Sequence, residues 1–373
     1  MLALMMSGGG ARAAYQIGVL RALARRYPDL DVPIVTGVSA GAINAATLAC
    51  RVGSFRDRVE SLVEMWMQLT TDQVFRVDPH WLGRNVIRWG MRLVSGGAPG
   101  VPRVRGLLDT APLRALLERI LHATNGWIGG VDENLHQRKL SALAVTASCY
   151  ANNVNTTWVQ GHIPEERRRP GITLLPARLH VDHVMASSAL PVLFPAVQVE
   201  GAWYGDGGMS LTAPLSPARR LGASKILAVS TRSLYRETGA PIEHYPSPAE
   251  IAGMLINAIF LDVFDADALR MEQINRLIAP LPAEQRMGLT HIDLFVMRPS
   301  QHLGRLANQF EPRMPVGLRF LTRGLGTRET RTNDFLSMVM FQPDYHARLI
   351  ELGAADAERR VAEIAAFLEG PRS

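Results

Sequence analysis

The sequence predicts an α/β fold in which a mostly parallel sheet carries helices on its faces. This prediction rests on two successive strand–turn–helix units near the N-terminus. Residues 2–6 form a short apolar run that leads into glycines, and residues 11–26 follow with apolar side chains at helical spacing. Residues 32–38 then have the pattern of a second strand, and residues 40–50 that of a helix of small residues. Strands that are each followed by a helix are expected to lie parallel in one sheet.

The remainder of the chain continues this alternation of strands and helices. We expect further strands at residues 140–150 with a hairpin partner at 155–160, and at 225–230 and 292–297. We expect further helices at residues 55–70, 113–121, 181–190, 249–278 and 344–368. No internal repeat and no linker interrupts the pattern, so the chain is expected to form one domain.

The composition is that of a globular protein with a sizeable core, since 47% of the residues are hydrophobic and 20% are charged. Cys50 and Cys149 lie far apart and outside any C-x-x-C spacing, which excludes a disulfide framework and a thiolate zinc site. The first residues carry no basic leader, and no apolar run of about 18 residues occurs. We therefore expect a cytoplasmic protein without a signal peptide or a membrane-spanning segment.

The net charge of +6 permits attraction to anionic partners such as lipid headgroups or nucleic acid. All but two of the 40 basic residues are arginines, the exceptions being Lys139 and Lys225. Arginine suits bidentate contacts with phosphate, but a GC-rich genome produces the same bias. The charge alone therefore selects no partner, and we expect no nucleic-acid ligand.

Gly37-Val38-Ser39-Ala40-Gly41 is the strongest local signal for chemistry. A nucleophilic serine on a sharp strand-to-helix turn has a strained backbone, and the glycines two positions before and after it relieve the crowding. The helix that follows directs the positive end of its dipole at the serine, which favours negative charge there. Because the motif stands between a predicted strand and a predicted helix, Ser39 is the candidate nucleophile.

A second glycine-rich segment, Ser7-Gly8-Gly9-Gly10-Ala11-Arg12, follows the first predicted strand. Consecutive glycines at the start of a helix expose several backbone N–H groups, which suit an oxyanion or a phosphate. The same segment also matches the dinucleotide fingerprint as Gly8-x-Gly10-x-x-Ala13. That fingerprint needs an acidic residue near the end of the second strand, whereas Asp29 and Asp31 precede that strand. An oxyanion site is therefore the favoured interpretation.

Asp206-Gly207-Gly208 is the third segment of interest. By itself, an aspartate followed by two glycines is typical of a surface turn. The three segments together, in this order and spacing, resemble the patatin-like phospholipases. The segment Ala186–Pro195 is similar to the family's sequence before the Asp-Gly-Gly strand, and the stretches Arg298–Ser300 and Ser337–Asp356 are similar to the C-terminal part of bacterial members. The resemblance covers most of the chain.

The resemblance implies a three-layer α/β/α patatin-like fold with a central, mostly parallel sheet. It implies a catalytic dyad with Ser39 as nucleophile and Asp206 as its partner, and an oxyanion hole in the glycine loop. The hole would consist of Gly8, Gly9, Gly10, Ala11 and Arg12, and the motif glycines Gly37, Gly41, Gly207 and Gly208 would support the dyad. Residues 1 to about 230 would form the catalytic core of a single domain spanning residues 1–373, and residues 231–373 would pack C-terminal helices and the last strand onto it.

Two positions depart from the family pattern. Ala13 stands where many members carry glycine, which the start of a helix tolerates. Thr212-Ala213-Pro214-Leu215 replaces the Asn-Asn-Pro sequence that is common after Asp-Gly-Gly, so a side chain that stabilises the turn is missing. Neither departure touches the dyad or the glycines of the hole. Arg12, directly after these glycines, either orients the loop or contacts a lipid phosphate, and we favour the first role.

His180 and His183 lie three residues apart near a predicted helix start, where they could act as a base, bind a metal or cap the helix. They match no catalytic position of the family, and no acidic group at metal-ligand spacing accompanies them. Capping or a place on the surface is therefore the favoured interpretation. We expect the protein to use neither a metal nor a cofactor.

The segment Trp81–Val94 has the pattern of a basic amphipathic helix. One stripe is apolar and consists of Leu82, Val86, Trp89 and Leu93. The other stripe is basic and consists of Arg84, Arg88 and Arg92. Such a helix is typical of segments that bind a lipid surface. The alternative is a lid helix that packs its apolar stripe on the protein's own core. Both interpretations stay open, so peripheral membrane contact is an expectation tied to this segment.

The motifs together predict a serine hydrolase of lipid acyl esters, of the phospholipase A or lysophospholipase type. Asp206 would accept the Ser39 proton while Oγ attacks the ester carbonyl, and water would then hydrolyse the acyl-enzyme. Because a free carboxylate is a weak base, the dyad is expected in a partly desolvated pocket. The alternatives are an acyl transferase that pairs serine with histidine, as malonyl transacylases do, a non-lipid esterase or thioesterase, and a non-catalytic regulatory protein on the same fold.

Overall fold

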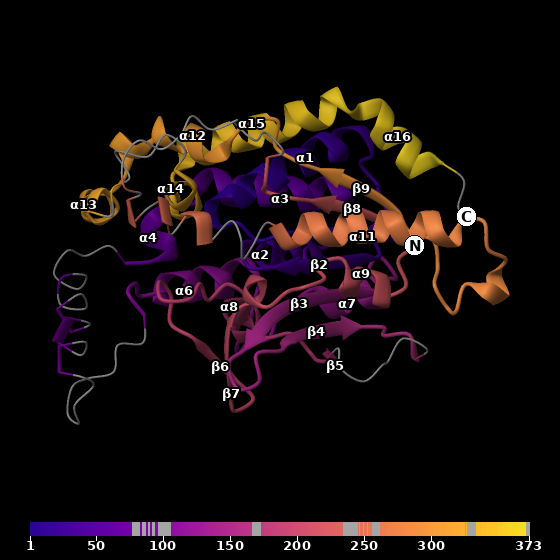
Figure 1. Ribbon diagram of the computed structural model, residues 1–373, viewed down its shortest axis with the longest axis horizontal. Helices are drawn as coiled ribbons and strands as arrows, with labels where there is room; N and C mark the ends of the chain where they lie inside the picture. Colours follow the sequence, from indigo (N-terminus) through magenta and orange to yellow (C-terminus); the bar gives the residue numbers. More distant parts are fainter. Residues whose placement is uncertain are drawn as a thin grey trace.

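The computed structural model describes residues 1–76, 106–165, 173–233, 262–324 and 333–370, together with residue 326 and scattered residues between 83 and 95 and between 245 and 255. These residues contain a nine-stranded sheet with the order β5-β4-β3-β2-β1-β8-β9, to which β7 adds on β3 and β6 on β7 (Figure 1). The strands are β1 (Leu2–Met6), β2 (Ile34–Val38), β3 (Ala142–Cys149), β4 (Asn155–Gly161), β5 (Thr173–Pro176), β6 (Val197–Val199), β7 (Ala202–Asp206), β8 (Lys225–Val229) and β9 (Asp293–Met297). Its central strands β3, β2, β1, β8 and β9 are parallel.

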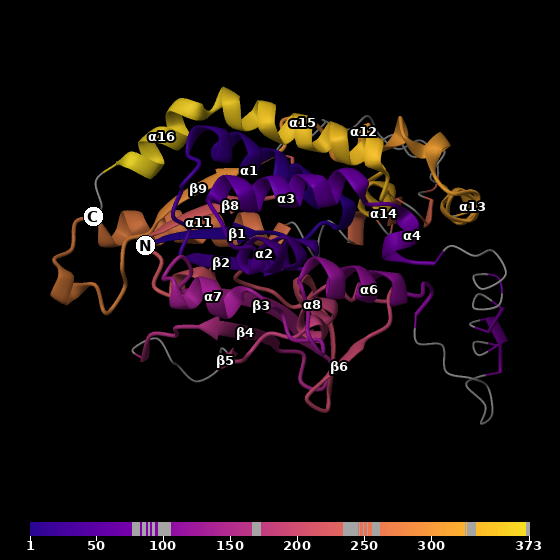
Figure 2. The same ribbon diagram turned by 180° about the vertical axis from the view of Figure 1, so that it is seen from behind.

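The helices form two layers on opposite faces of this sheet (Figures 1 and 2). The larger layer includes α1 (Ala14–Arg26), α2 (Ala40–Cys50), α3 (Phe55–Gln68), α6 (Ala111–Ile120), α7 (Val131–His136), α8 (Val181–Ser187) and α15 (Pro343–Arg359). The smaller layer contains α9 (Ser216–Arg220) and α11 (Asp262–Ile278). Strand β1 shows the division, because Leu4 and Met6 belong to the core under the larger layer, whereas Ala3 and Met5 belong to the core under α9 and α11. The predicted three-layer α/β/α fold is thus confirmed.

Shorter helices complete the described chain. They are α4 (Thr71–Val74), α12 (Leu303–Asn308), α13 (Val316–Gly324), α14 (Asp334–Val339) and α16 (Val361–Glu369). Helices α4, α13 and α14 lie toward one end of the sheet, at the left of Figure 1. A 3-10 turn, η1 (Gly10–Ala13), leads from the glycine loop into α1, so the helix start accepts Ala13 as expected.

Most of the predicted strands and helices are confirmed, with shifts of a few residues at their ends, but two helices differ. The predicted helix over 344–368 is broken into α15 and α16 at Arg360. The Arg360 side chain donates to the carbonyl of Val296 in β9 at 2.8 Å and lies 4.3 Å from the centroid of the Phe295 ring, so it holds the break against the sheet. We predicted a helix over residues 249–278, and α11 (Asp262–Ile278) forms the second half of that range.

The predicted amphipathic helix over Trp81–Val94 lies for the most part outside the described residues. The lipid-docking and lid interpretations of that segment therefore both remain predictions. No helix in the described part of the chain is long and apolar enough to cross a membrane.

The register of the sheet brings two distant chain segments together at one edge of β3. Strand β2 pairs with β3 as far as Val38 opposite Thr146. The antiparallel strand β7 then takes over, with Asp206 opposite Ala147. Because β4 occupies the other edge of β3, the last residue of β7 meets the end of β2. The carboxylate of Asp206 is in this way placed beside Ser39, the residue that follows Val38.

Helix α15 joins the C-terminal region to the N-terminal fold by an unusually close approach to α1. A Cβ atom at Gly18 of α1 would lie 2.1 Å from the carbonyl oxygen of Ile350. A Cβ atom at Gly353 of α15 would lie 2.2 Å from the carbonyl oxygen of Tyr15. Real carbon atoms cannot come so near a backbone oxygen, so the two helices can cross at this distance only with glycine at both positions.

We expect Gly18→Val to lower the melting temperature strongly, because the new side chain forces α15 away from α1. Overpacked substitutions usually cost about 1–3 kcal/mol, and more where backbone must move. Gly324→Ala in α13 is the matched control, since a Cβ there meets nothing within 4 Å and alanine favours helix over glycine. Thermal denaturation followed by circular dichroism measures both. A Gly18→Val variant that melts with the wild type would contradict the close crossing.

Candidate active site

Ser39 occupies the sharp turn between β2 and α2 and has a backbone conformation that serine rarely adopts, with φ 56° and ψ −133°. The two motif glycines make the turn sterically possible. A Cβ at Gly37 would lie 2.3 Å from the Gly41 carbonyl oxygen, and a Cβ at Gly41 would lie 2.2 Å from the Met6 carbonyl oxygen. The local geometry is that of a nucleophile elbow.

The carboxylate of Asp206 lies within hydrogen-bonding distance of the Ser39 hydroxyl. Ser39 Oγ donates to Asp206 Oδ2 at 2.5 Å, and the backbone N–H of Gly208 donates to Asp206 Oδ1 at 2.9 Å. Gly207 allows the chain to turn here, because a Cβ at that position would lie 2.0 Å from the Thr146 carbonyl oxygen. The three residues Asp206, Gly207 and Gly208 thus form a tight turn around a carboxylate, not a surface turn.

Burial changes the acid–base character of Asp206. The side chain has no contact with solvent, and Ser39 is only 2% exposed. Desolvation raises the pKa of Asp206 from 3.8 to about 7, against the hydrogen bonds from Ser39 and Gly208, which lower it. A carboxylate with such a pKa is a better proton acceptor near neutral pH than an exposed one.

The glycine loop passes directly over Ser39. A Cβ at Gly8 would lie 2.9 Å from Ser39 Cβ. Gly9 and Gly10 have positive φ angles of 151° and 56°, and their missing side chains leave room for Thr231 and for the Met338 carbonyl oxygen. Within the described chain, no acceptor takes the backbone N–H groups of Gly9 and Gly10. These buried donors are available to a negatively charged oxygen.

Arg12 closes the loop but turns its side chain away from the candidate site. Its backbone N–H donates to the Gly9 carbonyl at 3.2 Å. Its guanidinium is 2% exposed, donates to Ser337 Oγ at 2.6 Å and forms an ion pair with Asp334 at 2.6 Å. This placement fits the expected orienting role, since the guanidinium is engaged by α14.

The glycine loop is supported by a series of buried polar side chains that are linked by hydrogen bonds. The sequence analysis did not identify these side chains. Gln16 donates to the Ser7 carbonyl at 2.7 Å, Asn44 donates to Gln16 at 2.9 Å, and Trp66 donates to Asn44 at 2.8 Å. On the other side, Thr231 donates to the Gly8 carbonyl at 2.7 Å. The amides Gln16 and Asn44 stand in otherwise apolar buried helix faces, and this isolation is the signal that could have drawn attention to them.

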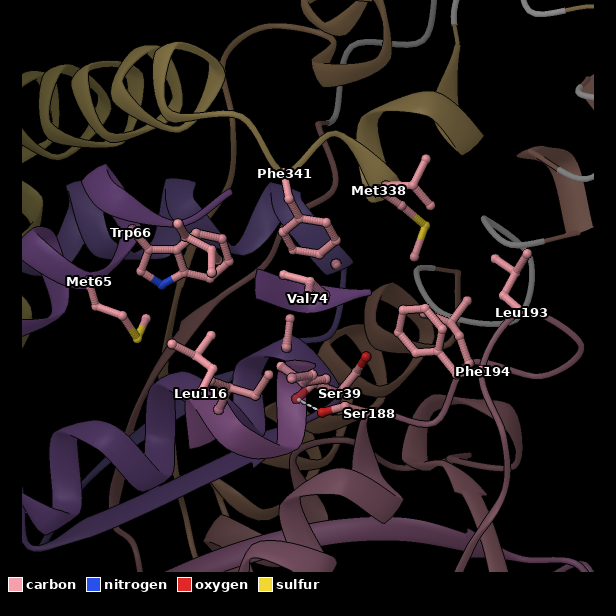
Figure 3. Close-up of a pocket in the computed structure, with 17 residues that line it drawn as sticks. Ser39, Met65, Trp66, Val74, Leu116, Ser188, Leu193, Phe194, Met338 and Phe341 are labelled. Carbon is pink, nitrogen blue, oxygen red and sulfur yellow. Dashed lines mark hydrogen bonds between the residues drawn. The ribbon is translucent and has the colours of Figure 1, made fainter. Parts of the chain in front are cut away.

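An apolar cavity of about 40 Å³ opens over Ser39 (Figure 3). Its wall is contributed by helices α2, α3, α6 and α14 and by the segment after α8, with side chains that include Trp66, Leu116, Leu190, Phe194, Met338 and Phe341. Ser39 and Ser188 are its hydroxyl-bearing residues. A cavity of this character suits an apolar ligand.

The two predicted capping histidines have that role at the start of α8. The ring of His180 accepts from the Asp182 N–H, and the ring of His183 accepts from the His180 N–H at 2.9 Å. His183 is buried against Trp158, with ring centroids 4.7 Å apart. The capping interpretation is confirmed, and neither histidine forms a hydrogen bond with Ser39. Among the described residues, no three His, Cys, Asp or Glu side chains lie close enough to hold a metal ion.

Comparison with protein families confirms the resemblance. The family model described as Patatin-like phospholipase matches residues 4–219, a range that holds the glycine loop, Ser39 and Asp206. The match covers more than half of the chain, which therefore belongs to the patatin-like phospholipase family.

Solved structures resemble the chain at low sequence identity. Human GIVD cytosolic phospholipase A2 has a TM-score of 0.50 and 12% identity over 99% of this chain and 60% of that chain. VipD from Legionella pneumophila has a TM-score of 0.37 and 13% identity over 98% of this chain and 66% of that chain. The chain spans less than two thirds of the length of each, and the likeness to the human protein concerns the fold alone. No curated protein sequence matches the chain.

We expect Asp206→Asn to melt at a higher temperature than the wild type at pH 8. The folded protein binds the Asp206 proton more tightly than the unfolded chain, since the pKa is raised from 3.8 to about 7. The wild type therefore loses stability as the pH rises from about 4 to about 7, whereas an amide does not titrate. Melting curves of both proteins between pH 4 and pH 8 measure the difference, which should shrink toward pH 4. A gap that is constant with pH would contradict the raised pKa.

Proposed function

We propose that this protein hydrolyses carboxylic esters of lipids, as a phospholipase A or lysophospholipase, with Ser39 as nucleophile and Asp206 as general base. One observation carries this proposal: a fully buried carboxylate accepts the Ser39 hydroxyl at 2.5 Å at the floor of an apolar cavity. The family membership supports a lipid substrate. The particular reaction and the roles of the residues are our proposal.

The first half of the reaction follows from the contacts of Ser39. Asp206 accepts the hydroxyl proton while Ser39 Oγ forms a bond to the acyl carbonyl carbon. The carbonyl oxygen becomes negatively charged and receives hydrogen bonds from the free backbone N–H groups of Gly9 and Gly10. The proton on Asp206 passes to the departing alcohol as its bond to the acyl carbon breaks, which leaves an acyl-enzyme.

The second half reverses these roles with water. A water molecule gives its proton to Asp206 and attacks the acyl carbon, and Ser39 Oγ then leaves with that proton. A carboxylate needs no third residue to fix a tautomer, as an imidazole does, so two side chains suffice. The raised pKa of Asp206 allows one group to accept and return the proton near neutral pH.

The cavity supports an acyl chain as the bound group, but it must widen to accept one. Its volume of about 40 Å³ accommodates a few water molecules, at about 10–15 Å³ each on the same measure. The lining includes Met65 and Met338, whose unbranched side chains adapt to irregular shapes at little cost. We propose that these side chains move apart when a lipid enters.

We also propose that residues 1–373 work as one catalytic domain. The C-terminal helix α14 supplies the partners of Arg12 and part of the cavity wall. Strand β9 extends the sheet at β8, the last strand of the catalytic core. The region after residue 230 thus supports the catalytic core from two directions.

We expect Ser39→Ala and Asp206→Asn each to remove nearly all hydrolysis of a soluble p-nitrophenyl ester. The double variant should be no worse than either single one, because the two residues act as a unit. Loss of a general base costs about 10²–10⁴-fold. Initial rates for the three variants, followed by a panel of phospholipids, lysophospholipids and triacylglycerols with the wild type, test the proposal. Asp206→Asn turnover above about a tenth of the wild-type value would remove Asp206 from the mechanism.

Replacing Gly10 by valine should reduce kcat by about 10²–10³-fold, the usual effect of losing an oxyanion donor. Valine disfavours the φ of 56°, and its Cβ would lie 2.2 Å from the Met338 carbonyl oxygen, so the loop must shift. Gly201→Val is the matched control, since Gly201 also has a positive φ of 84° but a Cβ there meets nothing within 4 Å. A folded Gly10→Val enzyme with normal kcat would show that the oxyanion is bound elsewhere.

A further inference from the structure

The short segment Ser187–Ala189, at the end of α8, contacts the backbone of both members of the proposed dyad. The Ser39 N–H donates to Ser187 Oγ at 2.9 Å, and Ser188 Oγ donates to the Ser39 carbonyl at 3.2 Å (Figure 3 shows Ser188 beside Ser39). The next residue, Ala189, accepts the N–H of Asp206 at 2.9 Å. Three consecutive residues therefore hold the backbones of Ser39 and Asp206, and so the position of each relative to the other.

The hydroxyl of Ser187 is fully used in this arrangement. It accepts the Ser39 N–H and donates its own proton to the Thr146 carbonyl at 2.6 Å. Thr146 lies in β3 at the point where β2 ends and β7 begins. Ser187 thus ties the nucleophile to the sheet, and its side chain is 0% exposed. The Ser39 N–H is occupied, so it is not available to an oxyanion.

The backbone of Ser39 needs such support. A non-glycine residue at φ 56° and ψ −133° persists only where its surroundings hold it. Ser187 and Ser188 form hydrogen bonds with the two polar backbone groups of Ser39, its N–H and its C=O. Together they oppose relaxation of the turn, which would carry Oγ away from Asp206.

The segment is itself attached to a firmly held helix. Helix α8 begins with the reciprocal capping of His180 and His183. The His183 ring packs on Trp158, whose ring centroid also lies 4.8 Å from that of Tyr204 in β7. A positioning group is effective only when its own place is fixed, and α8 meets this condition.

We propose that Ser187 and Ser188 are positioning residues that hold the strained Ser39 backbone, so that the segment Ser187–Ala189 sets the distance between the nucleophile and its base. This inference rests on the proposed function of Ser39 and Asp206. Neither serine exchanges a proton with the substrate. Their effect is on the geometry of attack, where a displacement of about 1 Å can cost about 100-fold in rate.

The test compares Ser187→Ala and Ser188→Ala with two matched variants. Ser188→Thr keeps the hydroxyl that donates to Ser39. Thr47→Val removes a buried hydroxyl that donates to the Ile43 carbonyl at 2.8 Å in α2, the helix that begins after Ser39, without touching the dyad. The measurements are the rate of covalent labelling by a fluorophosphonate, the labelled residue by peptide mass spectrometry, kcat and KM for a p-nitrophenyl ester, and the melting temperature.

In both alanine variants, the rate of fluorophosphonate labelling and kcat should each be about 10–100-fold lower than in the wild type. KM should stay within about twofold of the wild-type value. Ser188→Thr should recover most of the rate, and Thr47→Val should label like the wild type. If Ser187→Ala does not fold, Ser188→Ala and Ser188→Thr decide the question between them.

Three results would overturn the inference. Alanine variants that label as fast as the wild type would remove the positioning role and leave the proposed function intact. Equal slowing in Thr47→Val would show a general response to a lost buried hydrogen bond. A wild type that is not labelled at Ser39 would overturn the proposed function, and the positioning role with it.

Discussion

The placement of a carboxylate out of contact with solvent is the constraint on which the rest of the structure depends. Asp206 is fully buried, and within the described chain no arginine or lysine forms an ion pair with it. Among the described residues, its oxygens have the Ser39 hydroxyl and the Gly208 N–H as hydrogen-bond partners. Such a group is costly to bury, and the same desolvation raises the pKa of Asp206. In the proposed reaction, this lower stability of the fold is the counterpart of a stronger base beside the Ser39 hydroxyl.

The support of the site comes from parts of the chain that are far apart. The glycine loop depends on Thr231 after β8 and, through Arg12, on Asp334 and Ser337 of α14. The family match ends at residue 219, so these contacts lie beyond it. The proposed catalytic residues thus lie within the range of the family match, whereas part of the support for the loop comes from the C-terminal region of this chain.

Sequence patterns predicted the elements that carry local signals. The glycine motifs around Ser39 and Asp206 and the order of strands and helices fall in this class, because turn chemistry and hydrophobic periodicity act over a few residues. The meeting of β7 with the end of β2 could not be predicted, since it depends on the register of two strands along β3. The same holds for Ser187, whose role depends on the crossing of α8 over the turn, and for the break at Arg360, which depends on contacts with β9.

The position of β1 in the sheet has a consequence for how the protein folds during its synthesis. This strand is synthesised well before its neighbour β8 (Lys225–Val229), and α15, which packs on α1, is synthesised later still. Until then one edge of β1 is unpaired and α1 lacks its cover, so early folding intermediates expose apolar surface and an open strand edge. Folding dominated by such distant contacts is slow. The glycine loop can reach its supported form only after α14 has been synthesised, so a nascent chain on the ribosome carries the glycine motifs well before the candidate site has this support.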